Sequence, residues 1–382
     1  MSLSLIAYEN ITQSQTLYAR DFVDDLTDKH EGYAHTISAV GGYDSASFTI
    51  RGTKDYLQDW FDDGIMRRIV LYNPESIPIW EGFVNRLRFT AGTKQETKTI
   101  ENMYDKIYLK YSPLITNVSP PIEQPPVTLL FDDIDSQIKY GIKAVTLSGG
   151  GRTDRSAFDW GRTVLENRSE IATGESVNIT ATESYSLQVE CLGYWHTLKW
   201  IPYISTATGE IQSHQVIQEV LRYFNGLNSN WINQDFGLMD YNFSLSRRGY
   251  DDLPSCADVI EEIIKNGGAG SERWVGGVYQ YRQFVYKPAE EISGLYSDEI
   301  QLFRSLEDPG QLIYDTGMGT EVKPWDMTPD KILHTIDVNT GGSQHLKYIE
   351  QITYTEPYGL TLVGEDDERL SVWLARRGLP TI

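Results

Sequence analysis

The apolar and aromatic frame of residues 189–203 echoes that of residues 100–114 at a constant offset of 89 positions. The two segments read VECLGYWHTLKWIPY and IENMYDKIYLKYSPL. The matched pairs are Ile100 with Val189, Glu101 with Glu190, Met103 with Leu192, Leu109 with Leu198, Lys110 with Lys199, Tyr111 with Trp200 and Pro113 with Pro202. Cys191 and His196 stand opposite Asn102 and Ile107, so the frame repeats and the chemistry does not. This pattern predicts a shared structural element rather than a reactive site.

Strand-like alternation and short amphipathic helices follow one another in a similar order around both segments. In the first block, Ser45–Arg51 alternates like a strand, and Thr53 can cap a helix that Gly64 ends. That helix places Tyr56, Leu57, Trp60 and Phe61 on one stripe, and a hairpin turning at Asn73–Ser76 follows it. In the second block, a strand with a glycine turn precedes a helix with Ala157, Trp160, Val164 and Leu165 on one face. We predict a mainly β fold with α+β parts, built from two related small β-barrel domains and an additional α/β domain.

Five prolines in residues 112–126 argue against a helix interior or a central strand and predict an extended connector. Further on, Ser213 is placed to cap a helix that Asn225-Gly226 would end, Ser255 and Asp258 form a capping-box pattern, and Gly276-Gly277 suggests a turn between strands. The predicted division is a first barrel at 1–111, the Pro-rich connector at 112–126, a second, related barrel block at 127–205, a helix-containing α+β domain at 206–300 and a C-terminal β-rich segment at 301–382 that returns to the barrels.

The formal net charge of −21 disfavours specific binding of nucleic acid, because neutralising phosphates requires clustered Lys and Arg. Aromatic residues make up 12% of the chain, which favours β-rich architecture and large contact surfaces. Two cysteines, Cys191 and Cys256, argue against a disulfide scaffold and suit synthesis in a reducing cytoplasm. No apolar run is long enough to span a bilayer, and the first residues do not resemble an export signal, so we expect no membrane anchor.

Residues that could carry chemistry are scattered, and each has a simpler structural interpretation. His196 and Cys191 lack the neighbours that catalysis or zinc binding would need, which favours buried, satisfied side chains. Gly149–Gly151 could cradle a phosphate, but the spacing of known phosphate loops is missing. Asp132, Asp133 and Asp135 could hold calcium, but the glycine and the distal Glu of a calcium loop are missing. We therefore predict no catalytic, cofactor-binding or metal-binding residues, no cofactor and no enzymatic activity.

The order of several motifs resembles the baseplate hub and tail-tip proteins of long-tailed bacteriophages. These motifs are SFTIRG…IPIWEGFVNRL at the start, YGIKAVTLSGG followed by a helix and YSLQVECLGYWHTLKW in the centre, and GTEVKPWDMTPDKILHTIDV with YIEQITYTEPYGLTLVG at the end. The resemblance covers most of the chain and brings no catalytic signature.

This resemblance implies a structural virion protein made in the host cytoplasm. Such hubs join a sixfold tail tube to a threefold tail tip around the DNA channel. Two related barrels in each of three subunits give six similar units, which match the sixfold symmetry of the tube. The implied partners are two further copies of the chain, the tail tube or distal tail protein, the tape-measure protein, and tail fibre or spike proteins. An acidic lumen would let DNA pass without binding.

Two alternatives remain open, and an enzyme is the third choice. The chain could be a distal tail protein that forms a hexameric ring. It could also be a carbohydrate-binding module for receptor recognition, with Trp231, Tyr241, Trp274, Tyr279 and Tyr281 as a stacking platform. A glycoside hydrolase would need two carboxylates at a separation that a sequence does not reveal.

Overall fold

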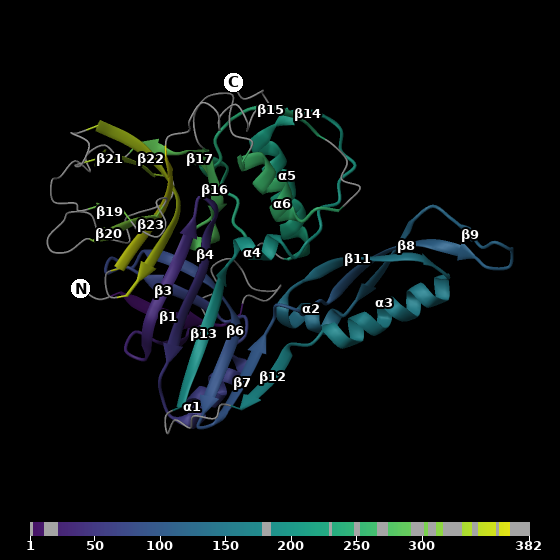
Figure 1. Ribbon diagram of the computed structural model, residues 1–382, viewed down its shortest axis with the longest axis horizontal. Helices are drawn as coiled ribbons and strands as arrows, with labels where there is room; N and C mark the ends of the chain where they lie inside the picture. The colour runs from purple at the N-terminus through teal and green to yellow at the C-terminus, as the bar shows by residue number, and fades with distance from the viewer. Residues whose placement is uncertain are drawn as a thin grey trace.

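The computed structural model shows a large β-rich body from which a small arm projects (Figure 1). It describes residues 3–10, 22–177, 185–228, 231–247, 253–265, 274–291, 302–304, 311–315, 331–337, 343–356 and 359–366. None of the helices within these ranges is both long and apolar enough to cross a membrane.

The body is organised around one sheet of 17 strands. Its strands are β1 (Ser4–Tyr8), β2 (Phe22–Asp25), β3 (His30–Ser38), β4 (Val40–Ile50), β5 (Arg68–Tyr72), β6 (Pro78–Ala91), β7 (Lys94–Thr99), β12 (Ala172–Val177), β13 (Tyr185–Gly193), β16 (Trp274–Val278), β17 (Phe284–Pro288), β18 (Glu290–Glu291), β19 (Leu302–Arg304), β20 (Gln311–Asp315), β21 (Lys331–Asp337), β22 (Ser343–Thr355) and β23 (Gly359–Asp366). The predicted mainly β class is confirmed.

Strands from distant parts of the chain meet in this sheet. β13 pairs antiparallel with both β4 and β6, and β22 pairs antiparallel with β3. No set of described strands closes on itself, so the two small barrels expected from the sequence are not found. Alternation identifies a half-buried strand but not its partner, and here β13 completes the sheet of the first block instead of starting a barrel of its own. The five-part domain division stays a prediction, and these pairings cross its boundaries.

Helix α1 (Lys54–Asp63) confirms the local prediction for the first block. Thr53 accepts a hydrogen bond from the amide of Tyr56 at its start, and Gly64 stands at its end. Leu57, Trp60 and Phe61 are buried, which fixes the helix against β6 and β13. A cap and an apolar stripe are local features, so the sequence suffices to predict them.

The body also contains a pair of contacting helices, α5 (Ser213–Leu227) and α6 (Cys256–Lys265). The apolar face of α5 is buried; Gln212 and not Ser213 is its cap, and the helix runs past Asn225-Gly226. At the start of α6, Asp258 and Ser255 exchange the predicted capping-box hydrogen bonds. The smaller elements here are α4 (Trp195–Leu198), β14 (Gly209–Gln212), β15 (Ser244–Arg247) and the 3₁₀ helices η1 (Phe236–Leu238) and η2 (Gln280–Arg282).

Gly276 and Gly277 lie inside β16, so the turn predicted at these glycines is wrong. The chain reverses later, through η2. β16 runs parallel to β4 and pairs with it at Val40, Gly41 and Gly42. A Cβ on Gly277 would lie 2.2 Å from the carbonyl carbon of Gly41, so these glycines permit a close approach of two backbones.

The arm is a small sheet covered by a helix on one face. It comprises β8 (Lys106–Ile115), β9 (Ile122–Glu123), β10 (Val127–Asp132), α2 (Ile134–Tyr140), β11 (Ala144–Arg152) and α3 (Asp154–Arg168). β8 is central, with β10 antiparallel on one side and β11 parallel on the other. Ala157 of α3 packs with Ile107, Leu109 and Phe131 in a core separate from that of the body.

The proline-rich segment 112–126 forms the outer end of this arm. Its first residues continue β8, and β9 turns back to pair Ile122 with Ile115. Gly149, Gly150 and Gly151 lie within β11, not in a loop before a helix, so they form no phosphate cradle. The register of β11 against β8 shifts between Ser148 and Gly150, which marks a bulge at these glycines.

Two buried charged residues join the arm to the body. The amide of Lys143 donates a 2.8 Å hydrogen bond to Oδ1 of Asp105. The Lys143 ammonium donates to the carbonyls of Ile100 and Glu101 and lies 5.2 Å from the centroid of the Trp200 ring. Burial raises the pKa of Asp105 to about 7 and lowers the pKa of Lys143 to about 8.

The two echoing segments adopt different structures. Residues 106–115 form β8, whereas residues 195–198 form the helical turn α4 after β13 ends. The shared apolar frame is buried in both, with Leu109 in the arm core and Leu198 in the body core. The predicted architectural role is confirmed, but the predicted shared element is wrong, since burial alone does not choose between strand and helix.

Candidate functional site

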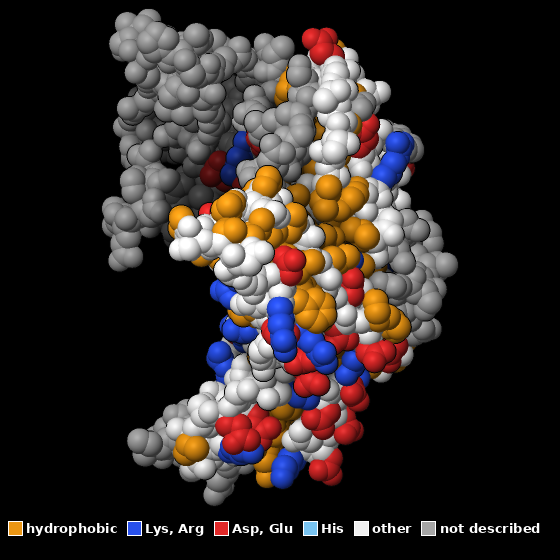
Figure 2. Space-filling view, turned by 90° about the vertical axis from the view of Figure 1, so that its right-hand side faces the viewer, with side chains coloured by type: hydrophobic (Ala, Val, Ile, Leu, Met, Phe, Trp, Pro, Cys, Tyr) orange, Lys and Arg blue, Asp and Glu red, His pale blue; other side chains and the backbone are white. Residues whose placement is uncertain are grey.

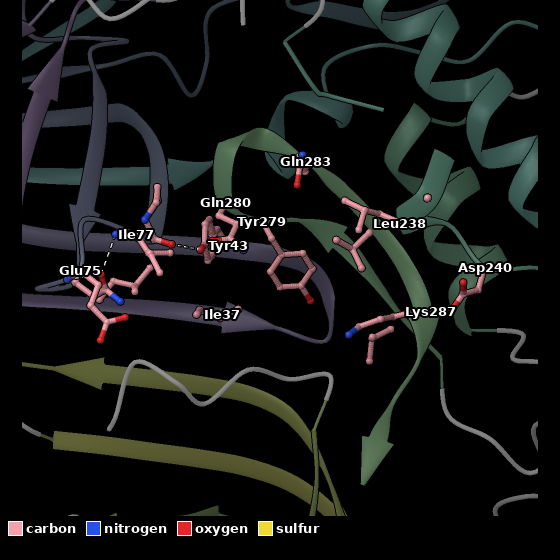
Figure 3. Close-up of a pocket in the computed structure, with 16 residues that line it drawn as sticks. Ile37, Tyr43, Glu75, Ile77, Leu238, Asp240, Tyr279, Gln280, Gln283 and Lys287 are labelled. Atoms are coloured by element: carbon pink, nitrogen blue, oxygen red, sulfur yellow. Dashed lines mark hydrogen bonds between the residues drawn. The ribbon is translucent and has the colours of Figure 1, made fainter. Parts of the chain in front are cut away.

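A cleft of about 520 Å³ opens on the body between the turn that joins β5 to β6 and the segment from η1 to β17 (Figure 3). Its lining mixes apolar side chains with amide and charged ones. The lining residues are Ile37, Tyr43, Asn73, Glu75, Ile77, Pro78, Ile79, Gly237, Leu238, Asp240, Val275, Tyr279, Gln280, Gln283, Val285 and Lys287. A concave surface that combines apolar walls with convergent polar groups is a candidate binding site.

Tyr43 and Tyr279 form the aromatic part of the cleft. Their rings meet edge to face with centroids 5.8 Å apart. The Tyr43 hydroxyl donates to the carbonyl of Pro78 at 3.3 Å, which ties β4 to the start of β6. Burial and the nearby Glu81 raise the pKa of Tyr43 well above its ordinary value, so this phenol stays neutral and acts as a fixed donor.

Asn73 shapes the opposite wall. Its side-chain oxygen accepts hydrogen bonds from the backbone amides of Glu75 and Ile77. The backbone amide of Asn73 donates to the carbonyl of Ile77. An Asn that bonds to the backbone ahead of it stabilises a tight turn, as the sequence predicted for this hairpin. Ile77 is held at the rim of the cleft and remains partly exposed.

A buried charge cluster anchors η2 beside the cleft. Glu81 of β6 accepts a 2.8 Å hydrogen bond from Nε of Arg68, and Nε of Arg282 lies 3.6 Å from the same carboxylate oxygen. Burial would lower the pKa of Arg68, but the charge and hydrogen bond of Glu81, together with Tyr194 and Tyr72, raise it above its ordinary value. The backbone of Arg282 is left-handed, with a φ of 58°, and the cluster holds it in that conformation. A variant at Glu81 would therefore disturb the wall of the cleft.

His196 and Cys191 take structural positions, as the sequence predicted. Nε2 of His196 lies 2.7 Å from Oδ1 of Asp44, which links α4 to β4. Cys191 is buried in the body core, and burial raises its pKa well above the ordinary value. Cys256 is also buried, and neither cysteine forms a disulfide.

The five aromatics of the alternative sugar platform do not form one surface. Trp231 is fully buried and packs edge to face on Trp200 with ring centroids 6.1 Å apart. Trp274 is buried against Tyr286. Tyr241 is exposed, but without the two indole rings no stacking surface of five aromatics exists. Aromatics in strands and beside helices bury a large apolar area, and here both indole rings lie in the core.

Two of the three aspartates considered for calcium are engaged in other ways, and Asp135 is exposed in the first turn of α2. Asp133 caps α2 by accepting from the amide of Ser136, and Asp132 accepts from Lys106 and Gln137. Across the part of the chain that the structure describes, no group of three His, Cys, Asp or Glu side chains is placed to hold a metal ion.

The cleft was missed at the sequence level because its walls come from residues up to 250 positions apart, such as Ile37 and Lys287.

No protein-family model matches the sequence, and no curated protein matches it. Three solved structures show a low similarity. They are a 43 kDa tail protein of prophage MuSo2 from Shewanella oneidensis (8% identity, 95% of both chains, TM-score 0.44), a tail protein from Neisseria meningitidis MC58 (7%, 96% of both, 0.45) and prophage tail protein gp18 from Listeria monocytogenes EGD-e (8%, 98% of both, 0.41). A TM-score below 0.5 does not establish a common fold.

Proposed function

We propose that this chain is a structural protein of a bacteriophage tail, and more specifically a hub or tail-tip adaptor around the DNA channel. The observation that carries the proposal is the order of motifs along the chain, which resembles that of hub proteins from the first block to the last. The resemblance includes YSLQVECLGYWHTLKW, which contains β13, and YIEQITYTEPYGLTLVG, which contains parts of β22 and β23. These strands join β3, β4 and β6 of the first block in one sheet.

The chemistry of the described residues is compatible with an assembly role. The cleft combines apolar, amide and charged side chains with a neutral phenol, and the buried charges at Glu81 and Lys143 are used for packing. The acidic composition would keep a channel-facing surface from binding DNA. In this proposal the chain forms trimers and contacts tube, tape-measure and fibre or spike proteins in the virion.

A distal tail protein that forms a hexameric ring is the second candidate. The sequence echo favoured the hub, because duplicated domains would turn three subunits into six similar units. That reason no longer holds, since the echoing segments form a strand in one case and a helical turn in the other. The hub assignment therefore depends on the motif order alone, and the number of subunits decides between the two.

Two measurements test the proposal. Antibody labelling of purified phage particles should mark the end of the tail, and absence of the chain from the particles would exclude a virion protein. Light scattering of the purified chain over a concentration series should give the mass of a trimer. A hexamer would instead favour the distal tail ring.

A further inference from the structure

Strand β10 leaves one edge of the arm sheet open. It pairs with β8 on one side, and no described strand pairs with its other side. Soluble proteins usually protect such edges with Lys, Pro or a bulge. Residues 127–132 read VTLLFD and contain none of these in the strand, and their pairing to β8 shows no register shift.

Exposed apolar side chains flank this edge on both faces of the sheet. Val127 pairs with Tyr111 and lies on the face that α3 covers, yet it is 43% exposed. Phe158 of α3 lies beside Phe131, with ring centroids 5.5 Å apart, and is 51% exposed. Leu130 pairs with Tyr108 on the other face and is 52% exposed. Figure 2 views the molecule from the side toward which the arm points, and hydrophobic side chains gather near the middle of that face.

The charge of the arm differs from that of the rest of the chain. Residues 106–168 contain eight Lys and Arg and seven Asp and Glu, a formal charge of +1, which leaves −22 for the remainder of the chain. The acidic bodies of two copies of the chain would repel each other, whereas their nearly neutral arms would not. A contact through the arms therefore brings two copies together at the least electrostatic cost.

The opposite edge of the arm sheet offers a partner of suitable shape. β11 pairs with β8 alone among the described strands, and its glycines carry no side chain that would block an approaching strand. A Cβ built on Gly150 would meet no atom within 4 Å. Thr128 of β10 and Ser148 of β11 both pair with Lys110 of β8, so they lie on the same face at the same level of the sheet.

We propose that the open edge of β10 pairs with the open edge of β11 in a second copy of this chain, so that neighbouring arms form one continuous sheet. Exchange of different edges is a head-to-tail contact, which can close into a ring of three or more copies. This inference rests on the proposed assembly function and names the surface through which copies would associate.

Self-association of the purified chain tests the surface. Leu130→Lys and Phe158→Lys together should weaken association at least about tenfold in light scattering over a concentration series, because two desolvated ammonium groups would face the partner strand. Val177→Lys is the matched control, since Val177 is an exposed apolar residue of β12, outside the arm, and it should associate like the wild type. Circular dichroism should show the same fold for all three. A wild-type chain that stays monomeric, or a double variant that associates normally, would overturn the proposal.

Cross-linking tests which edges meet. Equal amounts of Thr128→Cys and Ser148→Cys proteins, mixed under oxidising conditions, should form a disulfide between copies that neither protein forms alone. A cross-link in Thr128→Cys alone would show that two β10 edges pair and would overturn the head-to-tail arrangement. The proposed function has its own test in phage particles, so the chain could be a tail protein even if the arm variants associate normally.

Discussion

The backbone amide of Lys143 donates to the carboxylate of Asp105 where the arm meets the body, and both side chains are buried. Their pKa values move toward each other, with Asp105 raised to about 7 and Lys143 lowered to about 8 by burial. The pair therefore makes stability depend on pH in two opposite ways.

Asp105→Asn should remove a loss of stability that occurs as the pH rises from about 4 to 7. In that range the native state holds a proton on Asp105 that the unfolded chain has released, so unfolding free energy falls by at most about 1.4 kcal/mol per pH unit. For Lys143 the unfolded chain binds the proton more tightly, so stability recovers from about pH 8 to 10.5. Urea unfolding of wild type and variant at each pH measures the difference. Asp28→Asn, at an exposed turn, should leave the slope unchanged.

Glu81→Gln should destabilise the body by about 3–5 kcal/mol, because it leaves the buried guanidinium of Arg68 without its counter-charge. Glu31→Gln is a suitable control. It breaks a 2.6 Å ion pair with Arg51 in which both side chains are more than half exposed, so the loss should stay below about 1 kcal/mol. Chemical denaturation of the two variants measures both values. Equal losses would show that the Glu81 cluster is not a stabilising anchor.

Gly277→Ala should destabilise the protein by about 1–3 kcal/mol or more, because its methyl group would press on the backbone of Gly41 and force β16 away from β4. Gly174→Ala, in β12, has open space around its added Cβ and should change stability by less than about 1 kcal/mol. Thermal unfolding followed by circular dichroism compares the two. A Gly277→Ala protein as stable as wild type would mean that the two strands are not in close contact.

Cys191 and Cys256 should resist thiol reagents in the native protein. Both are buried, and burial raises the pKa of each thiol above its ordinary value, so little reactive thiolate is present at pH 8. Titration with a chromogenic disulfide should find about two thiols per chain, as the sequence contains, only after denaturation. Rapid modification of the native chain would contradict the burial of these residues.

Local features were predictable from the sequence. The cap at Thr53, the capping box of Ser255 with Asp258 and the turn at Asn73 all depend on hydrogen bonds within a few residues. The buried stripe of α1 depends on a repeat of 3.6 residues. The cap of α5 moved by one residue, because Gln212 and Gln215 form a reciprocal pair that the sequence pattern did not favour over Ser213.

The candidate site was not predictable in the same way. The cleft forms because η2 is anchored on Glu81, and this contact joins positions 81 and 282. Tertiary packing separates the five aromatics considered as a platform, because it places Trp231 in the core and Tyr241 at the surface. Residue type alone did not distinguish them, since an indole can serve either as a core residue or as a ligand platform.

The sequence by itself determined the mainly β class, the positions of α1, α3, α5 and α6 and the burial of the echoing frame, because apolar periodicity and caps act over short distances. Only the tertiary structure decided that Leu109 lies in a strand and Leu198 in a helical turn, and that β13 joins the first block. It also decided that Gly276 and Gly277 serve a close backbone contact instead of a turn. The physical reason is that strand pairing and close packing satisfy groups far apart in the chain, and the pattern of one segment does not name its partner.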